Sequence, residues 1–238
     1  MAVVSWKKST RLISAMHPLS GVPATMSSTS PSDPRQPALM LASLAMLLIL
    51  AISWWLTGDR MTWLLETLPV MIALPLLWAT HRRYPLTSLL YGLIFLHCVI
   101  LIYGGIYTYA KTPFGFWLQD WLGTMRNPYD KIGHFVQGFV PAMIAREILL
   151  RGDHVQGPKL RAFLLVCVVM FISSFYELLE WWVALLSGES AEAFLGTQGD
   201  PWDTQSDMAF ALLGGICALL LLSGLHDQQL RRLRSIRR

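Results

Sequence analysis

Six long apolar segments constrain this chain more than any other feature of its sequence. A helix needs about 20 mostly apolar residues to cross the hydrocarbon core of a bilayer. Runs of that length occur at about 38–56, 61–80, 86–107, 131–150, 162–186 and 207–225. Pro69 and Pro75 interrupt the second run, which membrane helices tolerate better than helices in water do. The sequence therefore predicts an all-α integral membrane protein with six transmembrane helices.

Composition excludes the main alternatives to a membrane protein. The chain is 54% hydrophobic and only 14% charged, which is too apolar for a soluble or a disordered chain of 238 residues. The formal net charge is +4, but the basic residues gather at the segment ends. They do not form the aromatic-interleaved basic stripe of a nucleic-acid-binding surface. We therefore expect the lipid bilayer as a partner and no nucleic acid, while the oligomeric state stays open.

The basic residues also predict the orientation, because Lys and Arg are retained on the cytoplasmic side of a membrane. When the segments alternate in direction, one side receives fifteen of the nineteen Lys and Arg residues, and the other receives Arg60, Lys111, Arg126 and Lys131. Both termini are therefore predicted to be cytoplasmic. We expect a disordered cytoplasmic tail at 1–37, a six-helix transmembrane domain at 38–226, and a basic cytoplasmic tail at 227–238.

Ionisable residues inside the predicted helices are the main indication of a functional site. Each costs on the order of 2.5 to 3.5 kcal/mol on insertion into a membrane, so their positions require an explanation. In the predicted topology they gather in the external half of the membrane: Glu66, Asp130, Lys131, His134, Glu177, Glu180, Asp203 and Asp207. Arg146 and Glu147 lie nearer the cytoplasmic side, and we expect them to reach the surface by snorkelling.

Helical spacing arranges the external polar residues in stripes, since residues three, four or seven apart share a face. The fourth, fifth and sixth segments each carry one stripe: Asp130, His134, Gln137 and Pro141; Ser173, Glu177, Glu180 and Ala184; Asp203, Asp207, Ala211 and Gly214. Small residues allow close approach of the sixth helix to a neighbour: Ala211, Gly214, Gly215 and Ala218. We therefore expect the three stripes to meet in one pocket near the external surface.

The residue types in this pocket suggest their roles. His134 follows Asp130 by one helical turn, so a carboxylate can orient the imidazole and leave its other nitrogen for a proton or a metal. The candidate catalytic residues are His134, Glu177, Glu180 and Asp207. The same four residues are candidate ligands of a divalent cation, whose oxygen-rich set favours Mg²⁺, Mn²⁺ or Ca²⁺. The candidate substrate-binding residues are Asp130, Lys131, Gln137 and Asp203, with Lys131 as the contact for an anion.

A structural interpretation of the same residues is also open. Asp130 and Asp203 lie where carboxylates cap the free N–H groups at helix N-termini. The two glutamates of the fifth segment can pair with Lys131 and Arg126 and simply hold the helices together. In that case the polar cluster stabilises the fold and binds nothing.

Three segments resemble a known family: YDKIGHFVQGF (Tyr129 to Phe139), SFYELLEWW (Ser174 to Trp182) and GDPWDTQSDMAFALLGG (Gly199 to Gly215). They are similar, over roughly residues 40–230, to the bacterial inner membrane proteins of the YjdF type, a family of unknown function. The order of the motifs also resembles, more distantly, the VanZ-like membrane proteins associated with glycopeptide resistance. The resemblance implies a multi-pass protein of the bacterial inner membrane in which the ionisable residues of these segments are motif positions. It implies no particular reaction.

Three classes of function are consistent with these features. The first is an enzyme or ligand-binding protein that acts on a lipid-linked molecule or another small molecule of the envelope. The second is a proton- or cation-coupled transporter, in which the same groups form a relay. Against it, the predicted polar residues stop at one side of the membrane and no inverted repeat is evident. The third is a structural or sensor membrane protein.

Overall fold

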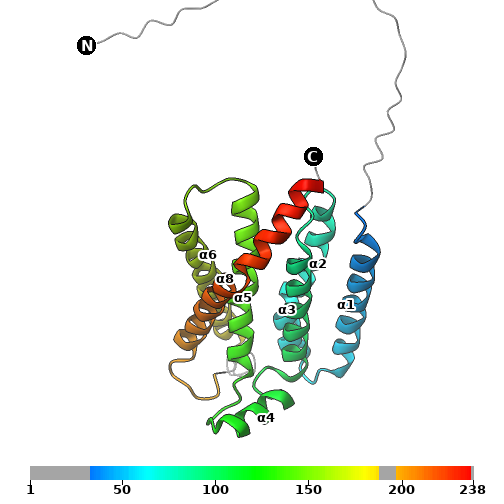
Figure 1. Ribbon diagram of the computed structural model, residues 1–238. Coiled ribbons are helices and arrows are strands. Elements are labelled where there is room, and N and C mark those ends of the chain that lie inside the picture. Colours follow the sequence, from blue (N-terminus) through cyan, green and yellow to red (C-terminus); the bar gives the residue numbers. More distant parts are fainter. Residues whose placement is uncertain (1–32, 188–196, 237–238) are drawn as a thin grey trace, which may run out of the picture. The chain divides into compact units, whose positions relative to one another are not determined.

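In the computed structural model, residues 33–187 and 197–236 are described, and they form seven helices and no strand (Figure 1). The helices are α1 (Gln36–Leu56), α2 (Arg60–His81), α3 (Ser88–Tyr107), α4 (Pro113–Leu122), α5 (Tyr129–Arg151), α6 (Pro158–Ser187) and α8 (Asp203–Ile236). The chain divides into two units, residues 1–36 and 37–238, and the helical bundle belongs to the second unit. Most of the expected amino-terminal tail, residues 1–32, lies outside the described residues.

The all-α class and the multi-pass character are confirmed. Five of the described helices are long and apolar enough to cross a membrane: α1, α2, α3, α6 and α8. The fourth expected span coincides with α5, which has 23 residues but is not among these five. At 1.5 Å per residue, α5 is about 35 Å long. Its length therefore suits a span, and its polar residues distinguish it from the other five.

Local sequence signals explain where the helices begin. Asp59 caps α2, where its Oδ1 accepts hydrogen bonds from the backbone N–H groups of Met61 (3.1 Å) and Thr62 (3.0 Å). Thr87 caps α3 in the same manner. The last helix extends beyond the expected span at both ends, from Asp203 to Ile236. Its 34 residues correspond to about 51 Å, so α8 continues through the start of the expected carboxy-terminal tail at residue 227.

Helix α4 was not expected from the sequence. It has ten residues, begins with Pro113 and ends at Leu122, and the following Gly123 adopts the left-handed conformation that glycine favours. It lies at one end of the bundle, which we call the α4 end (Figure 1). Trp117 and Trp121 are 60% and 72% exposed on its surface. Such aromatic residues are typical of helices that lie at the interface of a membrane.

Helix α5 is the centre of the bundle, packing against α3, α6 and α8. Its most extensive contact is with α8, and glycines make the approach close. A Cβ at Gly138 would collide with the backbone carbonyl of Ala211, and one at Gly214 would collide with that of Phe135. The expected close approach of the last helix is therefore present. It brings the polar first turns of α5 and α8 together at the α4 end.

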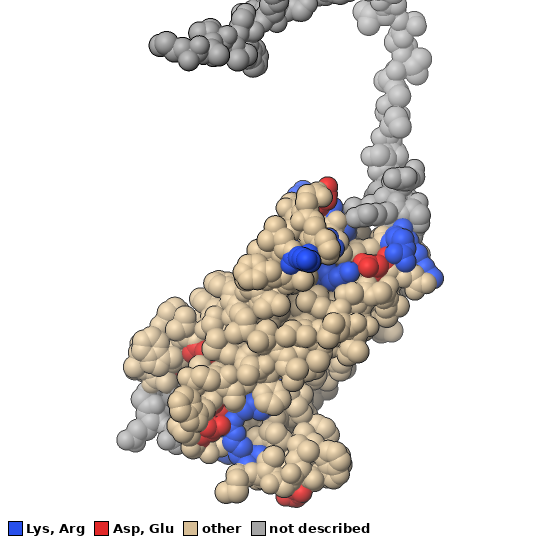
Figure 2. Space-filling view, turned by 60° about the vertical axis from the view of Figure 1, so that its left-hand side comes forward, with Lys and Arg blue, Asp and Glu red and all other residues tan. Residues whose placement is uncertain are grey.

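The outer surface of the bundle is apolar. Large hydrophobic side chains on α1, α2, α6 and α8 are exposed, for example Leu44 (61%), Ile72 (57%), Phe171 (67%) and Leu220 (78%). In the view of Figure 2 the Lys, Arg, Asp and Glu side chains gather toward the two ends, with a broad and largely uncharged belt between them. This arrangement suits a protein whose middle is surrounded by lipid.

Candidate functional site

Lys131 is the cation at the centre of a buried polar cluster at the α4 end. Its Nζ donates hydrogen bonds to Asp203 Oδ1 (2.7 Å) and Asp207 Oδ1 (2.6 Å), both on α8. Arg126, in the loop before α5, pairs with the same Asp203 at 2.5 Å and with Asp200 at 3.4 Å. Within the part of the chain that the structure describes, neither cation forms an ion pair with the glutamates of α6. The expected pairing of these cations with the two glutamates is therefore not present among those residues, while a structural role of the cluster stays open.

His134 lies one turn further along α5 and is only 4% exposed. Its Nε2 is 3.5 Å from Asp130 Oδ1 and 3.8 Å from Asp207 Oδ1. Its Nδ1 is 3.1 Å from Gln137 Oε1 and 3.7 Å from Glu177 Oε1. The imidazole thus lies among polar groups from α5, α6 and α8, the three helices whose stripes were expected to meet.

The two glutamates of α6 have different surroundings. The Glu177 side chain is 7% exposed, and its Oε1 has no hydrogen-bond partner among the described residues. Glu180 is also buried and interacts electrostatically with Glu177, Asp130 and Glu66. The sequence-based candidates on α5, α6 and α8 therefore lie in one region. The roles assigned to them stay predictions.

One acidic residue of this region was noted in the sequence but was not given a role among the candidate catalytic, binding or metal-ligating residues. Glu66 of α2 is 5% exposed, and its Oε2 accepts a hydrogen bond of 3.2 Å from the hydroxyl of Tyr176 on α6. Its position within an apolar segment is the signal that marked it as unusual. Its partner is 110 residues away in the chain, so no local pattern could place the two side by side.

The region carries an excess of negative charge. Two basic residues, Arg126 and Lys131, and one histidine lie among a larger number of acidic side chains: Glu66, Asp130, Glu177, Glu180, Asp200, Asp203 and Asp207. Buried charges of one sign repel one another strongly because little water screens them. The cluster therefore favours additional positive charge, carried either by protons or by a bound cation.

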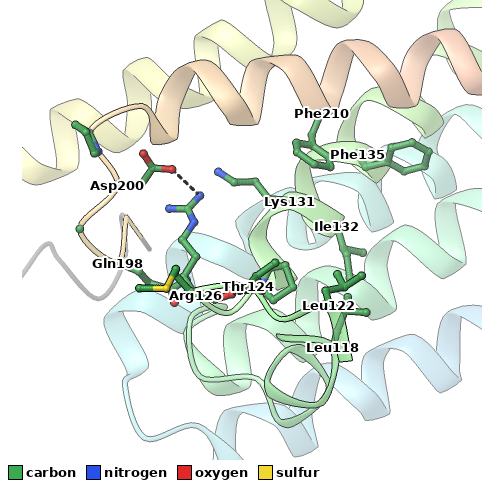
Figure 3. Close-up of a pocket in the computed structure, with 14 residues that line it drawn as sticks. Leu118, Leu122, Thr124, Arg126, Lys131, Ile132, Phe135, Gln198, Asp200 and Phe210 are labelled. Atoms are coloured by element: carbon green, nitrogen blue, oxygen red, sulfur yellow. Dashed lines mark hydrogen bonds and ion pairs between the residues drawn. The ribbon is translucent and has the colours of Figure 1, made fainter. Parts of the chain in front are cut away.

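A pocket of about 860 Å³ opens beside this cluster. As Figure 3 shows, Arg126, Lys131 and Asp200 lie together on one side of it. The other side is apolar and is formed by α4, α5 and α8: Leu118, Leu122, Ile132, Phe135 and Phe210. Ligand pockets are typically about 300–1,000 Å³, with mostly apolar walls and a few polar groups. This pocket fits that description and shares Lys131 with the buried cluster.

A second buried polar network lies at the opposite end of the bundle. Glu147 is fully buried and bonds to Thr87 Oγ1 (2.8 Å), Arg151 NH1 (2.7 Å) and His226 Nε2 (2.9 Å). Arg146 is 7% exposed and contacts His226 Nδ1 at 3.0 Å. The expected snorkelling of Arg146 and Glu147 is therefore wrong. Their side chains turn inward because α8 continues past the expected end of its span and covers them.

Comparison with known proteins places the chain in a family of predicted membrane proteins. The model of a family described as a predicted membrane protein (DUF2238) matches residues 38–228. The inner membrane protein YjdF of Escherichia coli (strain K12) is 58% identical over 194 residues, which cover 82% of this chain and 93% of that relative. No solved structure matches the chain. The resemblance to YjdF-type proteins is thus confirmed, while the more distant VanZ-like resemblance stays a prediction.

Proposed function

The chain belongs to the DUF2238 family of predicted membrane proteins, and from this premise we propose that it binds an amphipathic, lipid-like molecule of the cell envelope. The proposed site is the pocket at the α4 end. The observation that carries the proposal is the two-sided lining of this pocket, with Arg126, Lys131 and Asp200 opposite a wall of apolar side chains. A molecule with a charged head and an apolar tail matches both sides.

The position of the pocket supports an occupant that comes from the membrane. Its apolar wall includes Leu118 and Leu122 of α4, the helix whose Trp117 and Trp121 are exposed. An interfacial helix lies at the depth where lipid headgroups meet acyl chains. A lipid-like molecule can therefore reach the pocket from the bilayer without crossing water.

For the topology we propose six spans, which are the five apolar helices and, in addition, α5. We propose that both termini lie in the cytoplasm. The length of α5 and its packing between α3, α6 and α8 support a transmembrane position. The bias of Lys and Arg toward alternate loops supports the direction. In this topology the α4 end faces the external side of the inner membrane. Residues 1–37 and 227–238 are the proposed cytoplasmic tails.

The buried cluster is the proposed polar end of the site. We propose His134 as the group that accepts or delivers a proton, with Glu177, Glu180 and Asp207 as its carboxylate partners. Gln137 and Asp130 hold the imidazole from its two nitrogens. Lys131 connects the cluster to the pocket, since it lines the pocket and also bonds to Asp203 and Asp207. An anionic headgroup in the pocket would lie next to this lysine.

A transporter is the second candidate, and one observation favours it. Ionisable groups are buried at both ends of the same helix pair, around His134 at one end and around Glu147 at the other. Between them, however, α5 and α8 touch through Gly138 and Ala211, whose backbones leave no room even for a methyl group. Among the described residues this close contact separates the two polar groups along the α5–α8 seam, so we prefer the binding site.

The proposal is tested by the lipid and envelope composition of a strain that lacks the protein. The wild-type gene should restore the composition, whereas His134→Gln and Glu177→Gln should fail to restore it although the protein accumulates in the membrane. Asp153→Asn is the matched control, because Asp153 is an exposed acidic residue in the loop at the opposite end. Full restoration by both site variants at normal protein levels would contradict the proposal.

A further inference from the structure

Three side chains in the polar cluster have the arrangement of metal ligands. One donor atom each from Asp130, His134 and Asp207 lies within 4.8 Å of the other two. From this geometry we infer that the three residues bind a divalent cation. The inference goes beyond the proposed function, since the cation binds whether or not an amphipathic molecule fills the pocket. With the ion bound, His134 is a ligand and no longer transfers a proton.

The distances are close to those of a metal centre. Ligand atoms bound about 2.0–2.2 Å from one ion lie roughly 3 to 4 Å from each other. His134 Nε2 lies 3.5 Å from Asp130 Oδ1 and 3.8 Å from Asp207 Oδ1. Asp130 and His134 are one turn apart on α5, and Asp207 reaches them from α8 across the close α5–α8 contact. Small changes of side-chain rotamer are sufficient to place all three around one ion.

A separate observation shows that the surroundings of His134 favour additional positive charge. Glu177 Oε1 is 3.7 Å from His134 Nδ1, the ring nitrogen opposite the one that faces Asp130 and Asp207, and in the described part of the chain nothing donates a hydrogen bond to it. The Glu177 side chain is 7% exposed, so water does not readily replace a missing partner. A buried carboxylate oxygen without a donor is costly unless a proton neutralises it or a cation in the same cluster offsets its charge.

The contact with Gln137 orients the histidine for ligation. When His134 Nδ1–H donates to Gln137 Oε1, the lone pair of Nε2 faces the oxygens of Asp130 and Asp207. Three electron-rich atoms then point at one another, and a positive ion between them removes the repulsion. The alternative is an imidazolium, which carries a proton on both nitrogens and binds no metal.

The ligand set indicates which ion to use as a probe. Imidazole nitrogen suits transition metals, whereas carboxylates suit Mg²⁺, Ca²⁺ and Mn²⁺. Mn²⁺ accepts both kinds of ligand and is paramagnetic, so its binding can be observed directly. Lys131 Nζ bonds to Asp207 Oδ1 at 2.6 Å and therefore shares this carboxylate with the ion. The three residues offer one set of donor atoms, so we expect a single ion.

The test is a titration of the full-length protein with Mn²⁺. The protein is purified in detergent and freed of metal with a chelator, and electron paramagnetic resonance measures the free Mn²⁺. Wild type should bind about one Mn²⁺ per chain. Asp130→Asn and Asp207→Asn should each weaken binding at least tenfold. Asp200→Asn removes the same charge at the same end from a residue outside the ligand set, so its affinity should stay within about threefold of wild type.

A second measurement avoids any effect of the variants on folding. Pulsed electron paramagnetic resonance of Mn²⁺ bound to wild type should show coupling to a ¹⁴N nucleus, which identifies His134 as a ligand. Absence of stoichiometric binding, or bound Mn²⁺ without nitrogen coupling, would overturn the inference and would favour the imidazolium. Loss of affinity in all three aspartate variants alike would indicate general attraction by the acidic cluster and would overturn it as well. None of these results bears on whether the pocket binds an amphipathic molecule.

Discussion

Replacing Lys131 with methionine should destabilise the protein by a predictable amount. Lys131 is 9% exposed and bonds to Asp203 and Asp207, which are 6% and 1% exposed. Asp203 keeps Arg126 as a partner after the substitution, so the cost falls mainly on Asp207. Removal of one member of a buried ion pair costs about 3–5 kcal/mol, because the remaining charge stays buried without compensation.

This cost can be measured as a change in melting temperature. For a chain of this size, 1 kcal/mol corresponds to roughly 2–4 °C, so Lys131→Met should lower the Tm by about 6–20 °C. The assay is thermal unfolding of the detergent-purified protein, followed by tryptophan fluorescence. The double variant Lys131→Met/Asp207→Asn should recover most of the loss, since it removes the uncompensated charge. A Tm within about 2 °C of wild type for Lys131→Met would refute the reasoning, because a desolvated pair cannot be lost so cheaply.

Further predictions concern the helix contact, the second polar network and the topology. Gly138→Leu should lower the stability by about 1–3 kcal/mol or more, because the new leucine side chain must enter the α5–α8 contact. Gly92→Leu places the same side chain in open space and should leave the stability unchanged. Thermal unfolding of the two variants measures the difference. Glu147→Ala should lower the free energy of unfolding by about 3 kcal/mol or more, because His226 and Arg151 lose their buried carboxylate partner. An unchanged Tm in the same assay would contradict the burial of this network. Reporter fusions should be cytoplasmic at Gly152 and external at Gly123, and the reverse pattern would overturn the proposed orientation.

The helices could be predicted from the sequence because membrane insertion is read from local hydrophobicity. Any run of about 20 apolar residues satisfies the length of the bilayer by itself, and five such helices appear near their expected positions. Helix α4 was not predicted by this criterion, because its ten residues are too few for a membrane span. Pro113 and Gly123 mark its two ends, and these were the available signals.

The part of the candidate site that lies on a single helix could also be predicted from local sequence. The spacing of Asp130 and His134 places both on one face of α5, and this relation depends only on the helical repeat. The contacts of Glu66 with Tyr176 and of Glu147 with His226 join residues 110 and 79 positions apart. Such pairs depend on which helix covers which, and that is decided by tertiary packing rather than by a local pattern.

The proposed binding of a lipid-like molecule is tested most directly by native mass spectrometry of the protein released from a mild detergent. Wild type should retain a bound amphipathic molecule. Ile132→Trp, which fills the pocket between α4, α5 and α8, should lose it. Ile52→Trp places the same side chain on the exposed face of α1 and should retain it. A wild-type protein without such a molecule, or equal retention by Ile132→Trp, would contradict the account.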